Sequence, residues 1–149
     1  MARVSIPLNF DWKYCESYTQ EAMKREFDDS EFVVVNIPHA NKEIHFNNFD
    51  EKMYQFVSAY RKHFEFDKDA NEGKRVLLHF EGVANYAEVY LNDVRLGEHK
   101  CGYTAFTFDI TEALVQGENV LSVMVDSTER KDIPPFGNVV DYLCYGGIY

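Results

Sequence analysis

Apolar and polar residues alternate along much of the chain, and this period of two constrains the fold more than any other feature. Within residues 104–110, Phe106, Phe108 and Ile110 share one face, and small or polar residues occupy the other. An alternation of this kind predicts strands that bury one face and expose the other. The same pattern over 119–126 places Leu121, Val123 and Val125 on an inward face.

Further strands are predicted along the rest of the chain, separated by short turn signals. The segments with strand composition are 32–37, 60–66, 75–81, 86–91 and 94–96. Between the last two lies Asn92-Asp93, and both residue types tolerate positive φ, so the pair predicts a tight hairpin. Many strands at short spacing indicate an all-β domain.

Helical signals are few. Only Ser17–Phe27 has helical composition, and Ser17 followed by Gln20 resembles a capping box. We also expect a single helical turn over Thr111–Leu114. One short helix beside many strands predicts an antiparallel β-sandwich or jelly roll.

Composition limits the partners and the location of the chain. Its 149 residues are 46% hydrophobic, which is enough for one domain with a core. Lys+Arg number 15 against 25 Asp+Glu, and this net charge of −10 argues against nucleic acid as a partner. No apolar run reaches the roughly 18–20 residues of a membrane span, so we expect no membrane contact. The first residues lack the apolar core of a signal peptide, and we therefore expect a cytoplasmic location.

The cysteines and histidines do not form a recognisable site. The three cysteines, Cys15, Cys101 and Cys144, are odd in number and form no C-x-x-C pair, so we interpret them as reduced thiols. The five histidines lack the spacing of zinc ligands. The residues alone therefore predict no metal site and leave the question of a metal open.

Short motifs in the first half of the chain follow a recognisable order. The segment Phe27–Phe32 has the form FDDS-x-W, with Phe32 in place of Trp, and Asn36–His39 has the form LPH. The segment 59–64 has the form WYRK-x-F, with Ala59 in place of Trp.

The second half continues the same order. The run 73–92 has the form GKRV…FEGV…A-x-VYLN, followed by Asp93 where Gly is usual. The runs 96–106 and 109–126 resemble LG-x-H-x-GGYTPF and DIT…GEN…VD, with Cys101 and Ala105 as departures, and 141–149 resembles DF-x-x-YGGIY. Together, from about residue 10 to the end, they resemble the N-terminal sugar-binding domain of glycoside hydrolase family 2. That family includes β-galactosidases, β-glucuronidases and β-mannosidases, and its N-terminal domain is a jelly roll of the galactose-binding type.

The resemblance implies that catalysis resides elsewhere. The family hydrolyses β-glycosides with retention, which needs two carboxylates about 5–5.5 Å apart. Both belong to a downstream (β/α)₈ barrel, which alone needs about 250 residues. We therefore predict no catalytic residue in this chain and interpret residues 1–149 as one N-terminal domain of a larger enzyme, inactive alone.

Two residues are candidates for substrate binding by the resemblance. Asp141 matches an Asp that accepts hydrogen bonds from substrate hydroxyls, and in some members this Asp also helps to hold a sodium ion. Gln55 matches an Asn in the loop before the WYRK strand. No cofactor is expected in this chain itself, and a sodium or magnesium ion is an expectation for the full-length enzyme only.

Other interpretations of these residues stay open. Asp141 also fits a solvated loop acid or a cap, and Gln55 fits a surface amide. Tyr142 and Tyr145 fit packing better than stacking on a sugar. The whole chain also fits a stand-alone carbohydrate-binding or interaction module, or a scaffold without sugar contact.

The last residues, Gly146–Tyr149, resemble the start of a strand. If that strand is cut, unpaired backbone would lie at a sheet edge, and such edges invite pairing with another chain. We therefore expect self-association of the isolated domain through this edge.

Overall fold

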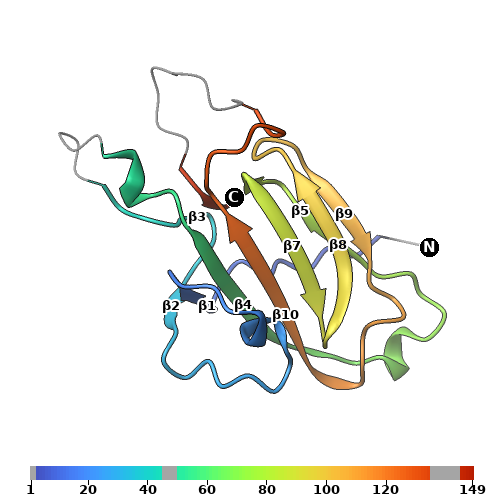
Figure 1. The fold of residues 1–149 in the computed structure, drawn as a ribbon. Coiled ribbons are helices and arrows are strands. Elements are labelled where there is room, and N and C mark those ends of the chain that lie inside the picture. The colour runs from blue at the N-terminus through green and yellow to red at the C-terminus, as the bar shows by residue number, and fades with distance from the viewer. Residues whose placement is uncertain (1–2, 45–49, 135–144) are drawn as a thin grey trace.

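The computed structural model describes residues 3–44, 50–134 and 145–149, and within them the chain forms two layers of antiparallel strands. One layer is a six-stranded sheet of order β2-β1-β4-β10-β7-β8. The other consists of a three-stranded sheet, β3-β11-β6, and a two-stranded sheet, β5-β9. In Figure 1, β5 and β9 lie behind β7 and β8, so the predicted all-β jelly-roll sandwich is confirmed.

The elements are short apart from two long central strands. Their bounds are β1 Trp12–Cys15, β2 Val33–Val35, β3 His39–Ala40, β4 Val57–Phe66, β5 Leu77–Phe80, β6 Val83–Ala84, β7 Tyr86–Leu91, β8 Val94–Lys100, β9 Phe106–Asp109, β10 Gly117–Asp126 and β11 Gly147–Ile148. Three 3₁₀ turns accompany them: η1 Gln20–Met23, η2 Glu51–Met53 and η3 Asp69–Asn71. No helix in the described part of the chain is long and apolar enough to cross a membrane.

The strands predicted from alternation are present, with shifted ends. The prediction for 86–91 coincides with β7, whereas β4 begins three residues earlier than expected, at Val57. β10 begins at Gly117, two residues before the predicted range 119–126. The sequence missed β1, β3 and β6, because two to four residues are too few to show a period, whereas β11 falls within the strand start predicted at Gly146–Tyr149.

The predicted helix over Ser17–Phe27 is wrong. Only η1 forms there, and its cap is Thr19, whose Oγ1 accepts a hydrogen bond of 3.3 Å from the backbone N–H of Ala22. At 111–114 the expected turn is present, since Leu114 N donates to Ile110 O at 3.1 Å. The hairpin is confirmed as well, with Asn92 and Asp93 at φ 49° and 71°.

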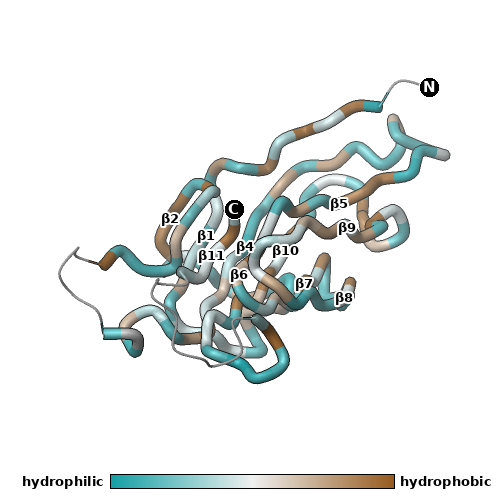
Figure 2. The backbone as a smooth tube through the Cα atoms, turned by 90° about the horizontal axis from the view of Figure 1, so that it is seen from above, coloured by the Kyte–Doolittle hydropathy of each residue, from teal (hydrophilic) through white to brown (hydrophobic). Residues whose placement is uncertain are grey.

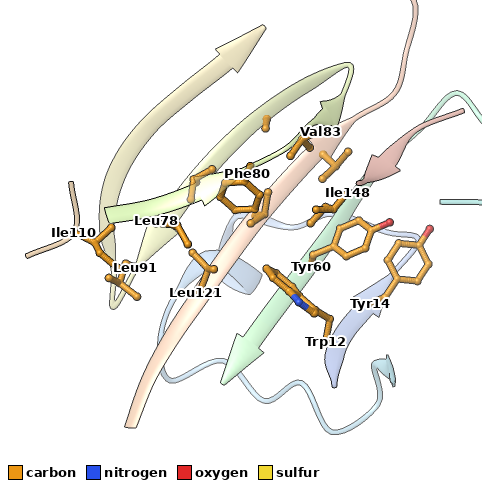
Figure 3. Packing of buried hydrophobic residues seen from close by; sticks show 14 of the residues in the cluster. Trp12, Tyr14, Tyr60, Leu78, Phe80, Val83, Leu91, Ile110, Leu121 and Ile148 are labelled. Carbon is orange, nitrogen blue, oxygen red and sulfur yellow. The ribbon is translucent and has the colours of Figure 1, made fainter. Parts of the chain in front are cut away.

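The core lies between the two layers (Figure 3). Leu121, Val123 and Val125 of β10 are at most 1% exposed and pack with side chains of both layers. Trp12 and Tyr60 meet edge to face, with ring centroids 6.5 Å apart. In Figure 2, apolar segments follow strands such as β2 and β5, and many peripheral loops are hydrophilic.

A second, smaller apolar cluster covers the outer face of the six-stranded sheet. It contains Met124 of β10, Tyr86 and Tyr90 of β7, and Ala22 and Met23 of η1. β10 is therefore buried on both faces, although its alternation predicted an exposed outer face.

The last strand lies inside a sheet. β11 pairs with β3 through Gly147↔Ala40 and with β6 through Gly147↔Ala84. Gly147 has φ +139°, and a Cβ there would lie 2.0 Å from the carbonyl oxygen of His39, so this pairing requires glycine. The expected open edge is therefore wrong for Gly147–Ile148, and self-association stays a prediction without that support.

Candidate functional site

Gln55, one of the two predicted sugar contacts, lies in the loop between η2 and β4. It is half-buried, and its side-chain Oε1 accepts a hydrogen bond of 3.3 Å from the backbone N–H of Glu129. Among the described residues, its amide Nε2 has no partner. An amide nitrogen with two hydrogens is thus free to donate to an incoming hydroxyl group.

Ser127, just after β10, fixes the backbone on both sides of Gln55. Its Oγ lies 2.7 Å from the carbonyl oxygen of Tyr54 and 2.8 Å from that of Phe56, and it accepts from Phe56 N at 3.2 Å. Ser127 N donates to Phe56 O at 3.1 Å. The side chain is buried, at 2% exposure, so the loop position of Gln55 is tied to the end of β10.

Asn41, which follows β3, connects this loop to the end of the chain. Its Nδ2 donates to Tyr54 O at 2.9 Å and to Ser127 Oγ at 2.8 Å. Its backbone N–H donates to Gly146 O at 2.8 Å, and its carbonyl accepts from the hydroxyl of Tyr14. Asn41 is 1% exposed, and its Oδ1 has no hydrogen-bond partner within the described chain.

Gly146 completes the arrangement, which we name the Gln55 corner: Asn41, Tyr54–Phe56, Ser127 and Tyr145–Gly146. A Cβ on Gly146 would lie 2.3 Å from Ser127 Cβ and 2.8 Å from Asn41 Nδ2, so only glycine fits. The Tyr145 ring lies 6.0 Å from that of Tyr54, which agrees with the packing expected for Tyr145.

Asp141 and Tyr142 lie outside the described residues, so their roles stay predictions. The structure nevertheless brings the loop of Gln55 beside Gly146, five positions after Asp141 in the chain. The loop of Gln55 and the segment Tyr145–Gly146 therefore meet at the Gln55 corner.

No metal site is visible in the parts of the chain that the structure covers. There, no group of three or more His, Cys, Asp or Glu side chains lies close enough to hold a metal ion. Cys15 and Cys101 are free thiols, whereas Cys144 falls in the segment left undescribed. Because Asp141 falls there too, the sodium expectation is untested.

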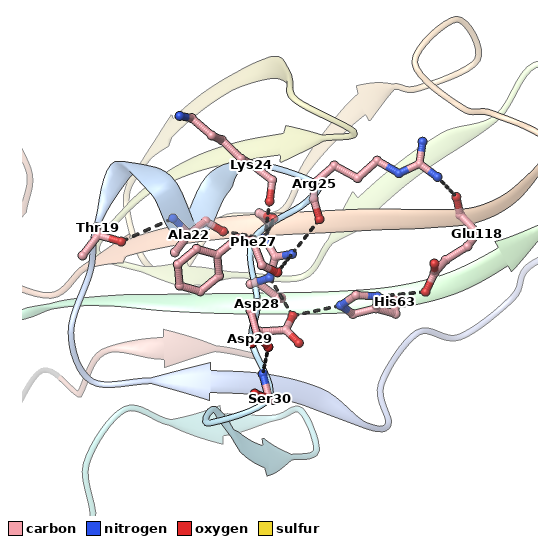
Figure 4. Close-up of polar contacts among 12 residues, drawn as sticks. Thr19, Ala22, Lys24, Arg25, Phe27, Asp28, Asp29, Ser30, His63 and Glu118 are labelled. Atoms are coloured by element: carbon pink, nitrogen blue, oxygen red, sulfur yellow. Dashed lines mark hydrogen bonds and ion pairs between the residues drawn. The ribbon is translucent and has the colours of Figure 1, made fainter.

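A buried charge cluster was missed from the sequence (Figure 4). Arg61 is fully buried, and its Nε donates to Asp29 Oδ2 at 2.7 Å. Its other nitrogens donate to Ser122 Oγ, to the backbone carbonyl of Ala22 in η1, and to those of Lys24, Arg25 and Phe27 between η1 and β2. Arg61 therefore fastens this segment to the sheet, and we name the pair with its contacts the Arg61 clasp.

Two neighbours complete the Arg61 clasp. His63 lies with Nε2 2.9 Å from Asp29 Oδ2 and Nδ1 3.0 Å from Glu118 Oε1. Burial alone would raise the pKa of Asp29, but hydrogen bonds from Arg61 and His63 outweigh it and hold that pKa below its usual value. Next to Asp29, the Oδ1 of Asp28 accepts a hydrogen bond of 3.0 Å from the backbone N–H of Ser30. The clasp is occupied by its own partners, so its role is structural.

The fold is an antiparallel β-sandwich of the galactose-binding type. The family described as "Glycosyl hydrolase 2 galactose-binding domain-like" matches residues 38–135, and the chain belongs to this family.

Relatives and solved structures agree. The chain is 51% identical to a β-galactosidase of Thermoanaerobacter pseudethanolicus over all of its own length and 20% of the relative. It is 31% identical to a β-glucuronidase of Formosa agariphila over 99% of its length and 16% of the relative. It superposes on Bacteroides uniformis β-glucuronidase 2 with a TM-score of 0.83 at 30% identity, covering 95% of this chain and 16% of that one. The chain thus spans about a fifth of the length of the curated relatives that it matches first.

Proposed function

We propose that this chain serves as the N-terminal sugar-binding domain of a longer, retaining β-glycosidase that cleaves β-galactosides. The observation that carries the proposal is the Gln55 corner, where a half-buried amide with a free donor lies beside the segment that follows Asp141. The 51% identity to a β-galactosidase favours galactosides over the glucuronides named for more distant relatives.

The chemistry of the two side chains suits a substrate rich in hydroxyl groups. The amide of Gln55 donates through Nε2, and an ionised Asp141 accepts two hydroxyl hydrogen bonds. Charge-assisted hydrogen bonds are the stronger kind, so we assign the larger share of sugar binding to Asp141. The two catalytic carboxylates and the remainder of the pocket come from domains that follow in the longer protein, and a sodium ion near Asp141 is part of the same proposal.

Further parts of the proposal concern the setting of the chain. We infer a cytoplasmic enzyme whose N-terminal domain packs on the domains that follow it. The alternative is a stand-alone binding module, and the reading frame distinguishes the two. Continuation past Tyr149 into βα repeats with two spaced glutamates supports the enzyme, and a stop codon directly after it supports the module.

The kinetic test uses the longer protein with nitrophenyl β-galactoside and β-glucuronide as substrates. We expect the galactoside to be preferred and Asp141→Ala to lower kcat/KM about 10- to 100-fold, because a charge-assisted hydrogen bond is lost. Gln55→Ala should cost about tenfold or less. Unchanged kinetics in both variants, with folding intact, would contradict the proposed sugar contacts. For the 149-residue chain alone we expect no turnover, and measurable hydrolysis by the pure chain would refute the assignment of catalysis to other domains.

A further inference from the structure

We propose that Asn41 and Ser127 are positioning residues that set the reach of Gln55 toward the substrate and tie it to the segment that follows Asp141. The inference rests on the proposed function and assigns roles to two buried residues that do not themselves touch sugar.

The first step is the fixing of Gln55 from both sides. Ser127 contacts the carbonyl of Tyr54, and it bonds both the N–H and the carbonyl of Phe56. Because the residues before and after Gln55 are held, its Cα has little freedom, and the orientation of its side chain follows from the backbone. Gln55 carries one methylene more than the Asn of the motif it resembles. The position of its side-chain amide therefore depends on a fixed backbone position.

The second step is the link between the Gln55 loop and Gly146, in the segment that follows Asp141. Asn41 donates from Nδ2 to both the Tyr54 carbonyl and Ser127 Oγ, and from its backbone N–H to Gly146 O. Through its side chain and its backbone, this one residue therefore joins the Gln55 loop, the end of β10 and the chain just after Tyr145. A shift of any of these segments would have to break a hydrogen bond that is shielded from water.

The third step is the close packing around Gly146. Gly146 leaves no room for a Cβ against Ser127 and Asn41, so the three segments are in direct contact. Asn41 Oδ1 is also buried without a hydrogen-bond partner in the described part of the chain. A buried acceptor without a partner costs free energy, so its presence calls for an explanation. The two hydrogen bonds donated by Nδ2 fix the orientation of the amide, and this orientation leaves Oδ1 without a donor.

The experiment is a double-mutant cycle in the longer protein, read as kcat/KM for nitrophenyl β-galactoside. The variants are Ser127→Ala, Gln55→Ala and the double variant. If Ser127 acts through Gln55, Ser127→Ala should lower kcat/KM about three- to tenfold in the wild-type background and less than about twofold when Gln55 is already Ala.

Ser122→Ala is the matched control. Ser122 lies on β10, the strand that ends just before Ser127, and it is as deeply buried, but its Oγ accepts from Arg61 rather than from the Gln55 loop. We expect it to lower the melting temperature without changing kcat/KM. Asn41→Asp is the second variant, because it keeps the shape of the side chain while removing the Nδ2 donors. It should show the same dependence on Gln55, so the proposal stays testable if Ser127→Ala fails to fold.

The outcomes separate this inference from the proposed function. If Gln55→Ala leaves kcat/KM unchanged, the sugar contact of Gln55 fails and the positioning role falls with it. If Gln55→Ala lowers kcat/KM but the effect of Ser127→Ala is undiminished in the double variant, the sugar contact stands and the positioning role is overturned. An equal loss of kcat/KM in Ser122→Ala would also overturn it, since general destabilisation would then explain the effect.

Discussion

The two faces of the six-stranded sheet are buried in different ways. The inner face packs apolar side chains such as Val89, Leu121 and Val123 against the opposite layer. The outer face buries fewer apolar side chains, such as Met124 and Tyr90, and it also buries a complete ion pair, Arg61 with Asp29. Both faces exclude water, but they depend on different interactions.

The difference lies in how each face responds to a change. An apolar core loses stability in proportion to the volume removed. A buried ion pair stabilises the fold little more than a well-packed apolar replacement would. Removing one partner, however, leaves a buried charge without compensation and strongly destabilises the fold. Removing one partner of the ion pair on the outer face should therefore cost more free energy of unfolding than truncating one apolar side chain on the inner face.

The largest effect is expected at the Arg61 clasp. Arg61→Met would leave Asp29 and several backbone carbonyls of the η1–β2 segment without their donor. We expect a loss of about 3–5 kcal/mol in the free energy of unfolding. Urea unfolding followed by tryptophan fluorescence measures it.

Two further variants sharpen this prediction. Lys62→Met removes a positive charge from the same strand and should change the free energy of unfolding by less than about 1 kcal/mol. The double variant Arg61→Met/Asp29→Asn should be more stable than the sum of the single variants, because the uncompensated carboxylate is gone. A strictly additive double variant would show that the ion pair does not connect the two residues energetically.

A somewhat smaller effect is expected on the inner face. Leu121→Ala removes a side chain that is 1% exposed, and we expect a loss of about 3 kcal/mol from lost burial and the cavity left behind. Leu77→Ala is the matched control, because Leu77 is 52% exposed and should cost far less. If Leu121→Ala proved costlier than Arg61→Met in the same unfolding assay, the ranking of the two faces would be reversed.

The smallest effect concerns pH. The pKa of Asp29 is lower in the folded than in the unfolded chain, so its contribution is fully present above the unfolded value of about 3.9 and is lost as pH falls through the folded value. Wild-type stability should therefore fall more steeply than that of Asp29→Asn below about pH 4. Unfolding measured across this range in both proteins tests the slope, and parallel curves would contradict the role of Asp29.

The inner face was predictable from the sequence because it depends on local patterning. The alternation over 119–126 placed Leu121 and Val123 correctly, and Asn92-Asp93 marked the hairpin. The Arg61 clasp was not predictable in this way. Its partners come from the segment between η1 and β2, more than 30 positions earlier in the chain, and an Arg between strand residues reads as exposed.

The candidate site also contains one residue that the sequence pointed to and two that it missed. Resemblance pointed to Gln55, and the structure places it in the loop before β4 as expected. Asn41 and Ser127 were missed, because an Asn after a two-residue strand and a Ser after a long one carry no local signal. Their importance comes from hydrogen bonds across 13 and 71 positions of the chain.

The sequence by itself determined the all-β class, the inward face of β10, the family and the loop that carries Gln55. Each of these depends on residue type and on short spacing along the chain, and both can be read from the sequence without knowing the tertiary contacts. Only the tertiary structure decided that the outer face closes over Arg61, that β11 lies within a sheet, and that Asn41 joins Gln55 to the end of the chain. These features depend on which distant backbone groups come within hydrogen-bonding distance, and only the folded arrangement of the strands sets that distance.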